Sequence, residues 1–155
     1  VLDYGIGLNE LGNPTGIFAN VSLEEDDTEA EGNGGNIEID TGFLSINNGA
    51  NISASTFGNG NAGNIMIRAS DRISLDGAVR VETLVNSFIQ SSGVATRVGF
   101  AGIGNGGNID ITAGSLSVTN GAELIASTYN QGNAGRIRAN VRDSVIFDGS
   151  FEGKP

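Results

Sequence analysis

The chain has 155 residues, a length that suits one ordinary domain, and it carries a formal net charge of −10 with a pI near 4.2. It contains no cysteine, histidine or tryptophan, which excludes disulfides, thiol nucleophiles, imidazole bases and the common histidine- and cysteine-based metal sites. An acidic surface repels phosphate, so we expect no nucleic-acid partner.

An internal repeat runs along the whole chain. The hexamer "GNGGNI" at 32–37 returns at 104–109, an offset of 72 residues, and the same offset aligns "GIFANV" (16–21) with "FIQSSG" (88–93) without a gap. A variant of the motif, "GNAGNI" at 60–65, divides each unit in two. The sequence predicts a single domain of 72-residue repeats over 1–155, partial over 1–31, complete over 32–103 and partial over 104–155. We expect it to be part of a longer chain.

Each half of the repeat contains three short runs that alternate between apolar and polar residues. They fall at 36–40, 44–46 and 51–56 in the first half, and at 64–68, 73–75 and 88–92 in the second. This period of two is typical of half-buried strands, and no segment has helical spacing of apolar residues. The sequence therefore predicts an all-β fold with little or no helix, a parallel β-helix of about four turns with three short strands in each.

The alternation assigns inward side chains to columns that contain one residue from each turn. The first strand gives Ile37, Ile65, Ile109 and Ile137, and beside them Ile39, Ile67, Ile111 and Ala139. The second gives Leu44, Ile73, Leu116 and Val145, and beside them Ile46, Leu75, Val118 and Phe147. The third gives Ile17, Ile52, Ile89 and Leu124, and beside them Ala19, Ala54, Ser91 and Ala126. With about 4.8 Å between strands, the stack should be about 20 Å tall.

The glycine motif has two interpretations. "GNGNAG" (58–63) matches the dinucleotide fingerprint, but that fingerprint needs a following helix and a strand pattern follows here. We therefore predict a corner of the coil, in which Gly32, Gly34 and Gly35 permit the bend. Asn36 should form a side-chain ladder with Asn64 and Asn108 that stops at Arg136. No cofactor is predicted.

An acidic run, "LEEDDTEAE", occupies 23–31, and its partner at 95–103 contains no acid. We interpret the run as a solvated loop, and we assign 77–87 and 94–103 to variable loops as well, where any contact with a partner would lie. Calcium binding is the sharper alternative, although the spacing matches neither the EF-hand nor the nonapeptide calcium repeat. Its weak candidate ligands are Glu24, Glu25, Asp26, Asp27, Glu29 and Glu31.

Two other functions remain open beside a structural one. Parallel β-helices also support polysaccharide lyases and hydrolases, and the outward candidates are Glu38, Asp40, Asp110, Arg68 and Arg138. These residues form no recognisable acid and base pair, so we predict no catalytic residues and no enzyme activity. An uncapped coil also exposes strand edges, which could stack end to end into a filament.

The ordered triplet "GNGGNI", "TNGA" and "GNAG" over 104–135, with the "TGIFANV" strand at 15–21, resembles the repeats of large filamentous-haemagglutinin-like exoproteins of the cyanobacterial, two-partner-secretion type. The resemblance implies a right-handed parallel β-helical shaft in an adhesin-like protein. It also implies export through an outer-membrane transporter to the bacterial cell surface, in a secreted, extracellular location. The implied partners are neighbouring turns or copies, and a surface receptor or glycan. No functional residues follow from the resemblance.

Overall fold

Every regular element in the computed structural model is a β-strand. The structure describes residues 15–21, 30–82 and 87–149. The strands are β1 (Gly16–Phe18), β2 (Ile37–Asn47), β3 (Asn51–Ser53), β4 (Ile65–Asp76), β5 (Ala78–Glu82), β6 (Ser87–Ser91), β7 (Gly93–Val98), β8 (Ile109–Thr119), β9 (Glu123–Thr128) and β10 (Ile137–Asp148). The all-β prediction is confirmed for these residues. None of the described segments contains a helix long and apolar enough to span a membrane.

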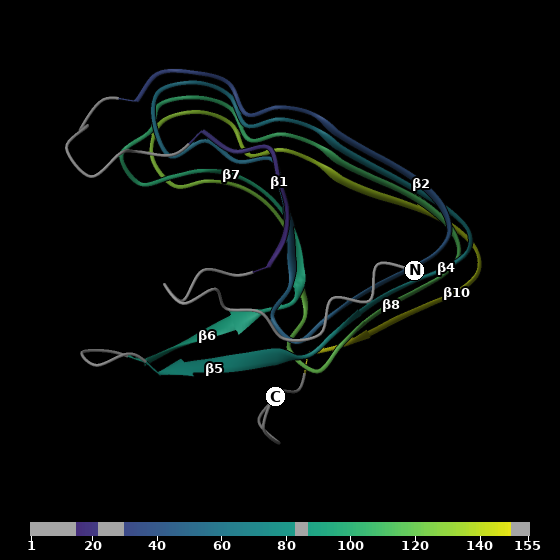
Figure 1. The fold of residues 1–155 in the computed structure, drawn as a ribbon. Coiled ribbons are helices and arrows are strands. Elements are labelled where there is room, and N and C mark those ends of the chain that lie inside the picture. Colours follow the sequence, from purple (N-terminus) through teal and green to yellow (C-terminus); the bar gives the residue numbers. More distant parts are fainter. Residues whose placement is uncertain (1–14, 22–29, 83–86, 150–155) are drawn as a thin grey trace.

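Two parallel sheets are built by a chain that alternates between them. β1, β3, β7 and β9 form one sheet, the short-strand sheet, and β2, β4, β8 and β10 form the other, the long-strand sheet. We call one traverse of both sheets a pass. Strands of successive passes are neighbours in each sheet, and Figure 1 shows the passes lying over one another along nearly the same path.

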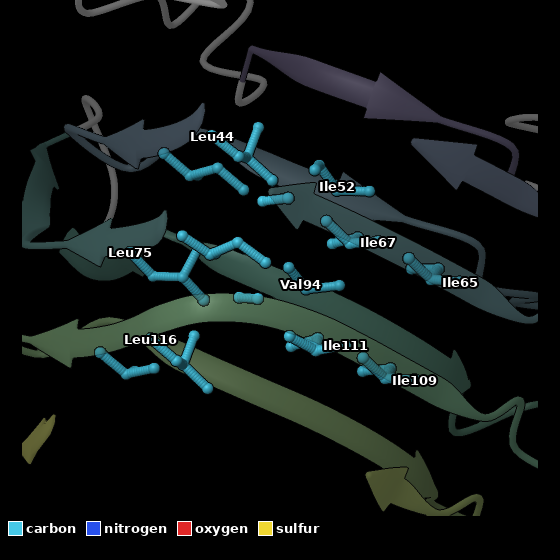
Figure 2. Close-up of a cluster of buried hydrophobic side chains, with 14 of the residues drawn as sticks. Leu44, Ile52, Ile65, Ile67, Leu75, Val94, Ile109, Ile111 and Leu116 are labelled. Atoms are coloured by element: carbon cyan, nitrogen blue, oxygen red, sulfur yellow. The ribbon is translucent and has the colours of Figure 1, made fainter. Parts of the chain in front are cut away.

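The hydrophobic core lies between the two sheets. In the long-strand sheet, Ile37, Ile65, Ile109 and Ile137 are register partners, as predicted. The other three predicted columns of this sheet are also confirmed, because Leu44 pairs with Ile73 and Ile46 pairs with Leu75, and the pairing continues in later passes. Figure 2 shows these aliphatic side chains in rows from one strand to the next, facing Ile52 and Val94 of the opposite sheet. Their burial is the main stabilising contribution.

The prediction of three short strands per pass is wrong at the first boundary. The runs 36–40 and 44–46 belong to one strand, β2, and the register shifts between Thr41 and Phe43 without breaking the pairing. Each pairing between neighbouring long strands contains one such register shift. The extra residues are accommodated as a bulge, which bends a strand while the flanking hydrogen bonds persist.

The two columns predicted for the third strand are wrong in one pass. Val94, not Ile89, pairs with Ile52 and Leu124, and Thr96, not Ser91, pairs with Ala126. Ile89 lies on β6, which pairs with β5 in an antiparallel hairpin that projects from the stack of strands. The assignment of 94–103 to a loop is therefore wrong for 94–98, which form a buried strand. The segment predicted as a loop at 77–87 contains β5 and the first residue of β6.

Insertions of different length explain this error. Val21 bridges Thr56 and Thr56 bridges Val98, so Val21 and its equivalent two passes on are 77 residues apart. The motif glycines keep the offset of 72 residues. A gap is therefore needed between them, because nine residues separate Val21 from Glu31 whereas four separate Val98 from Ile103. The ungapped alignment of 16–21 with 88–93 is wrong for this reason, although the alignment of 32–77 with 104–149 starts and ends in register.

The corner after the short-strand sheet carries two asparagine ladders. The first has the predicted positions, but its bonds join side chain to backbone: Asn36 Oδ1 accepts the backbone N–H of Asn64 at 2.8 Å, and Asn64 Oδ1 accepts that of Asn108 at 2.9 Å. The ladder ends where the Arg136 N–H donates to Asn108 Oδ1 at 3.0 Å. A second ladder, which the sequence analysis missed, runs through Asn33, Asn61, Asn105 and Asn133 with N–H to Oδ1 distances of 2.7, 2.8 and 3.0 Å.

The motif glycines have a role that differs in part from the prediction. Gly32 has a φ of 153° and Gly60 a φ of 146°, values that favour glycine. Gly34 and Gly35 are not among the residues with positive φ. Their position requires close approach instead, since a Cβ on Gly63 would overlap the carbonyl oxygen of Gly35 in the preceding pass. Small size at these positions lets the corners stack at the strand spacing.

Candidate functional site

The outer face of the long-strand sheet contains every outward charged residue that the sequence singled out. Register places Glu38, Met66, Asp110 and Arg138 in one row across the four strands, and Asp40, Arg68, Thr112 and Asn140 in the next. We call these eight residues the charged face. They lie side by side because residues two apart on a strand point to the same side of the sheet.

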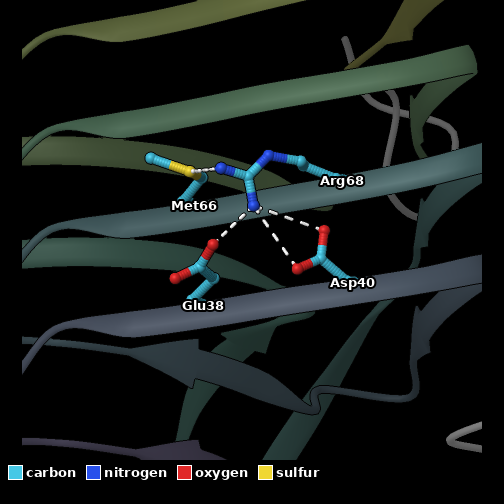
Figure 3. Close-up of polar contacts among 4 residues, drawn as sticks. All are labelled: Glu38, Asp40, Met66 and Arg68. Carbon is cyan, nitrogen blue, oxygen red and sulfur yellow. Dashed lines mark hydrogen bonds and ion pairs between the residues drawn. The ribbon is translucent and has the colours of Figure 1, made fainter.

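Arg68 joins the two carboxylates at one end of this face. Its Nη1 lies 2.5 Å from Glu38 Oε1 and 3.3 Å from Asp40 Oδ1, and its Nη2 lies 2.6 Å from Met66 Sδ. Figure 3 shows the guanidinium on β4 reaching to both acids on β2. All three charged side chains are exposed. The sequence predicted their common face, and the structure adds the contact between them.

Glu38 and Asp40 accept hydrogen bonds from the Arg68 guanidinium, and these bonds, first that to Glu38 and then that to Asp40, raise the pKa of Arg68 above its ordinary value. The stabilisation of a base with a raised pKa is fully present below the ordinary value and is lost only as the pH rises through the folded-state pKa. The guanidinium therefore stays protonated at every physiological pH. Because the group is exposed to solvent, its contribution to the stability of the fold is small.

A depression of about 270 Å³ lies beside this cluster on the same face. Its lining includes Met66, Arg68, Asp110, Thr112 and Arg138. The depression places two guanidinium groups and one carboxylate around a space large enough for a small polar molecule. Glu38 and Asp40, however, are already bound to Arg68 and are not part of its lining. The arrangement can hold a polar ligand, but it presents no pair of carboxylates on opposite sides of a bond to be cleaved.

The structure places the remaining sequence candidates as follows. Five residues of the acidic run lie outside the described residues: Glu24, Glu25, Asp26, Asp27 and Glu29. Glu31 is exposed, and its backbone forms an isolated parallel β-bridge with Asn59. Within the described part of the chain, no group of three or more acidic side chains is close enough to hold a metal ion. The "GNGNAG" segment at 58–63 leads into β4, so it lacks the helix that a dinucleotide site requires.

Two further features of the surface lie outside the charged face. One is the exposed end of the stack at β10, where Val145 and Phe147 are 49% and 65% exposed although their partners deeper in the stack are buried. The other is a polar groove between the β5–β6 hairpin and the outer face of the short-strand sheet. The first follows from the columns, since the last member of each column lacks one neighbour. The second depends on the hairpin, which the repeat alignment hid.

No protein-family model, curated protein or solved structure shows significant similarity to this chain. Its function is therefore inferred from its own residues.

Proposed function

We propose that this chain is a non-catalytic segment of a right-handed parallel β-helical shaft, about four turns long, in a large secreted exoprotein of adhesin type at the bacterial cell surface. The observation that carries the proposal is the continuity of like residues from pass to pass. Four apolar columns and two asparagine ladders extend from the first pass to the last. Such ladders make every pass a template for the next, which is the principle of a rod.

The distribution of polar groups supports a scaffold rather than an enzyme. The best-defined charged cluster joins Arg68 to Glu38 and Asp40 in solvent, where such pairs serve as surface contacts. A polysaccharide lyase or hydrolase remains the alternative that the sequence raised, and no contact of the charged face favours it. In the proposed role the faces between the corners carry binding surfaces, and the shaft sets the distance between them.

The shaft can be tested by adding one repeat. A second copy of residues 32–103 inserted between positions 103 and 104 should be accommodated in register. Small-angle scattering should show a particle lengthened by about 10 Å, two strand spacings, with an unchanged cross-section. Thermal stability should be equal or higher, because each added pass brings a new interface. A cross-section that grows, or a scattering curve of a flexible chain, would contradict the proposal.

Assembly through the end of the stack is a second candidate, and the exposed end at β10 favours it. The strand has no neighbour beyond it among the described residues, and Ile137, Val145 and Phe147 are exposed in columns that are otherwise buried. An unpaired edge with an apolar column is a template for another strand. In the proposed role a further pass or another copy of the chain covers this edge.

A further inference from the structure

A polar groove lies where the β5–β6 hairpin meets the outer face of the short-strand sheet. It has a volume of about 200 Å³, and its lining includes Asn51, Gln90, Ser91, Ala95, Arg97 and Glu123. The hairpin provides one wall, since Gln90 and Ser91 belong to β6. The floor comes from β7, where Gly93 and Ala95 leave space because their side chains are small.

The wall of this groove is fixed at its base. Asn51 Nδ2 donates to the carbonyl of Ser91 at 2.9 Å, and the N–H of Gly49 donates to Ser92 Oγ at 2.9 Å. Val79 of the hairpin packs so closely on Gly49 that a Cβ there would lie 2.7 Å from its Cγ2. The groove is therefore preformed, which lowers the entropic cost of binding a ligand.

Arg97 is the unusual group in this groove. Its backbone N–H donates to Ser55 Oγ at 3.1 Å, but its side-chain Nε is buried and has no hydrogen-bond partner. The described residues give its guanidinium no carboxylate partner either. Buried donors are nearly always satisfied in folded proteins, and the Oγ of its register partner Ser127 is also buried without a partner. The terminal N–H groups of the guanidinium form a fork that fits the two oxygens of one carboxylate.

A second charged group lies toward the other end of the groove. Glu123 pairs in register with Gly93, and Arg97 pairs with Ser127, so the two charged residues are four positions apart along the strands. Four positions correspond to about 13 Å between backbones. The amide of Gln90 and the carboxylate of Glu123 can bind hydroxyl groups along this length. The net charge of −10 disfavours a polyanion, so a ligand with one negative charge fits best.

We propose that this groove binds a sugar acid, a ligand with one carboxylate held by Arg97 and hydroxyl groups held by Gln90 and Glu123. This inference goes beyond the shaft, which needs neither the hairpin nor Arg97. Its failure would leave the proposed function intact, because the columns and ladders lie in other parts of each pass. The hairpin, which interrupts the repeat in one pass, then has a role as the wall of a binding site.

The test titrates the isotope-labelled chain with glucuronate and monitors the NMR signal of Arg97 Nε–H. Glucuronate should shift this signal and the side-chain amide of Gln90 in a saturable way, and glucose should bind at least about tenfold more weakly because it lacks the carboxylate. Arg97→Gln should weaken glucuronate binding by about tenfold or more. Arg97→Lys should give an intermediate loss, because lysine keeps the charge without the fork.

Arg142→Gln is the matched control, since Arg142 is an exposed arginine on β10 that lines neither the groove nor the depression on the charged face, and its replacement should leave binding unchanged. Melting curves confirm that each variant is folded, and Arg97→Lys replaces Arg97→Gln if the latter unfolds. Three results would overturn the proposal: no saturable shift with glucuronate, equal affinity for glucose, or undiminished binding by the folded Arg97 variants. Equal affinity for acetate or for N-acetylglutamate would also overturn it, because the groove would then recognise a carboxylate without the sugar.

Discussion

Single residues at the corners of this chain act through two separate mechanisms. Asparagines such as Asn61 satisfy exposed backbone groups of the next pass, since Asn61 Oδ1 accepts both the backbone and the side-chain N–H of Asn105 at 2.8 and 3.2 Å. Glycines such as Gly107 permit the approach of two backbones, because a Cβ there would overlap the carbonyl oxygen of Gly63. The first is a bonding role and the second a steric one, so the two should differ in their sensitivity to substitution.

Asn61→Ala should lower the free energy of unfolding by about 1 kcal/mol, the usual net value of a hydrogen bond in a folded protein. Asn133→Ala is the matched control, because Asn133 donates to Asn105 but no described residue donates to its own Oδ1. It should cost about half as much or less. Urea denaturation of both variants measures the difference. Equal losses would show that the ladder adds nothing beyond the local turn.

Gly107→Ala should lower the free energy of unfolding by about 3 kcal/mol, because a methyl group must displace a backbone carbonyl of the neighbouring pass. Gly42→Ala provides the comparison, since the nearest atom to a Cβ there is Ser70 Oγ at 3.8 Å, an ordinary contact. That variant should be nearly neutral. Thermal denaturation followed by circular dichroism distinguishes them, and a neutral Gly107→Ala would show that the corners are not stacked as closely as described.

At the level of elements, the sequence predicted the long-strand sheet better than the short-strand sheet. Period-two alternation in segments such as Ile65–Asp76 identifies inward residues directly, and the glycine motif before each long strand fixes the register of that strand with its neighbours. In the short-strand sheet the same alternation exists, but the segments that follow β1 and β7 differ in length, with nine residues between Val21 and Glu31 and four between Val98 and Ile103. An alignment at one constant offset cannot reveal this difference. Arg97 was missed for the same reason, because 95–103 was aligned with the acidic run.

Deletion of residues 78–91 should leave the parallel stack intact. The hairpin begins after Gly77 and ends before Ser92, which donates its N–H to the Gly77 carbonyl at 3.0 Å, so the deletion joins two residues already in contact. The cost should be about 2 kcal/mol, mainly from Val81, the most buried apolar side chain among the described residues of the hairpin. Circular dichroism and a melting curve measure it. Loss of the β-sheet signal would contradict the assignment of the hairpin as an insertion.

At the scale of the whole molecule, the two ends of the stack differ. On β2, at one end of the long-strand sheet, Leu44 and Ile46 are 2% and 5% exposed, whereas their equivalents on β10, Val145 and Phe147, are exposed. Among the described residues, only the β10 end therefore exposes members of these two columns beside an unpaired strand edge. An interface between copies that used this end would be formed by two like ends and would close as a dimer, unless the β2 end also takes part.

Self-association should depend on the β10 end. Val145→Asp combined with Phe147→Asp should shift the sedimentation profile toward the monomer at concentrations where the parent chain associates, because a charge on the apolar column opposes burial. Glu38→Gln with Asp40→Asn, on the outer face of the other end, should leave the profile unchanged. If the parent chain remains a monomer at high concentration, assembly through this end is excluded.

The central claim is that successive passes lie in parallel register, and engineered disulfides test it directly because the chain has no cysteine of its own. Ser45 pairs with Ser74 and Ser74 pairs with Ser117. The pairs Ser45→Cys with Ser74→Cys, and Ser74→Cys with Ser117→Cys, should form disulfides, since neighbouring strands lie about 4.8 Å apart. Ser45→Cys with Ser117→Cys, about 10 Å apart, should remain reduced. Mass spectrometry of the oxidised proteins gives the result, and a disulfide only in the third variant would contradict the stacked register on which the account depends.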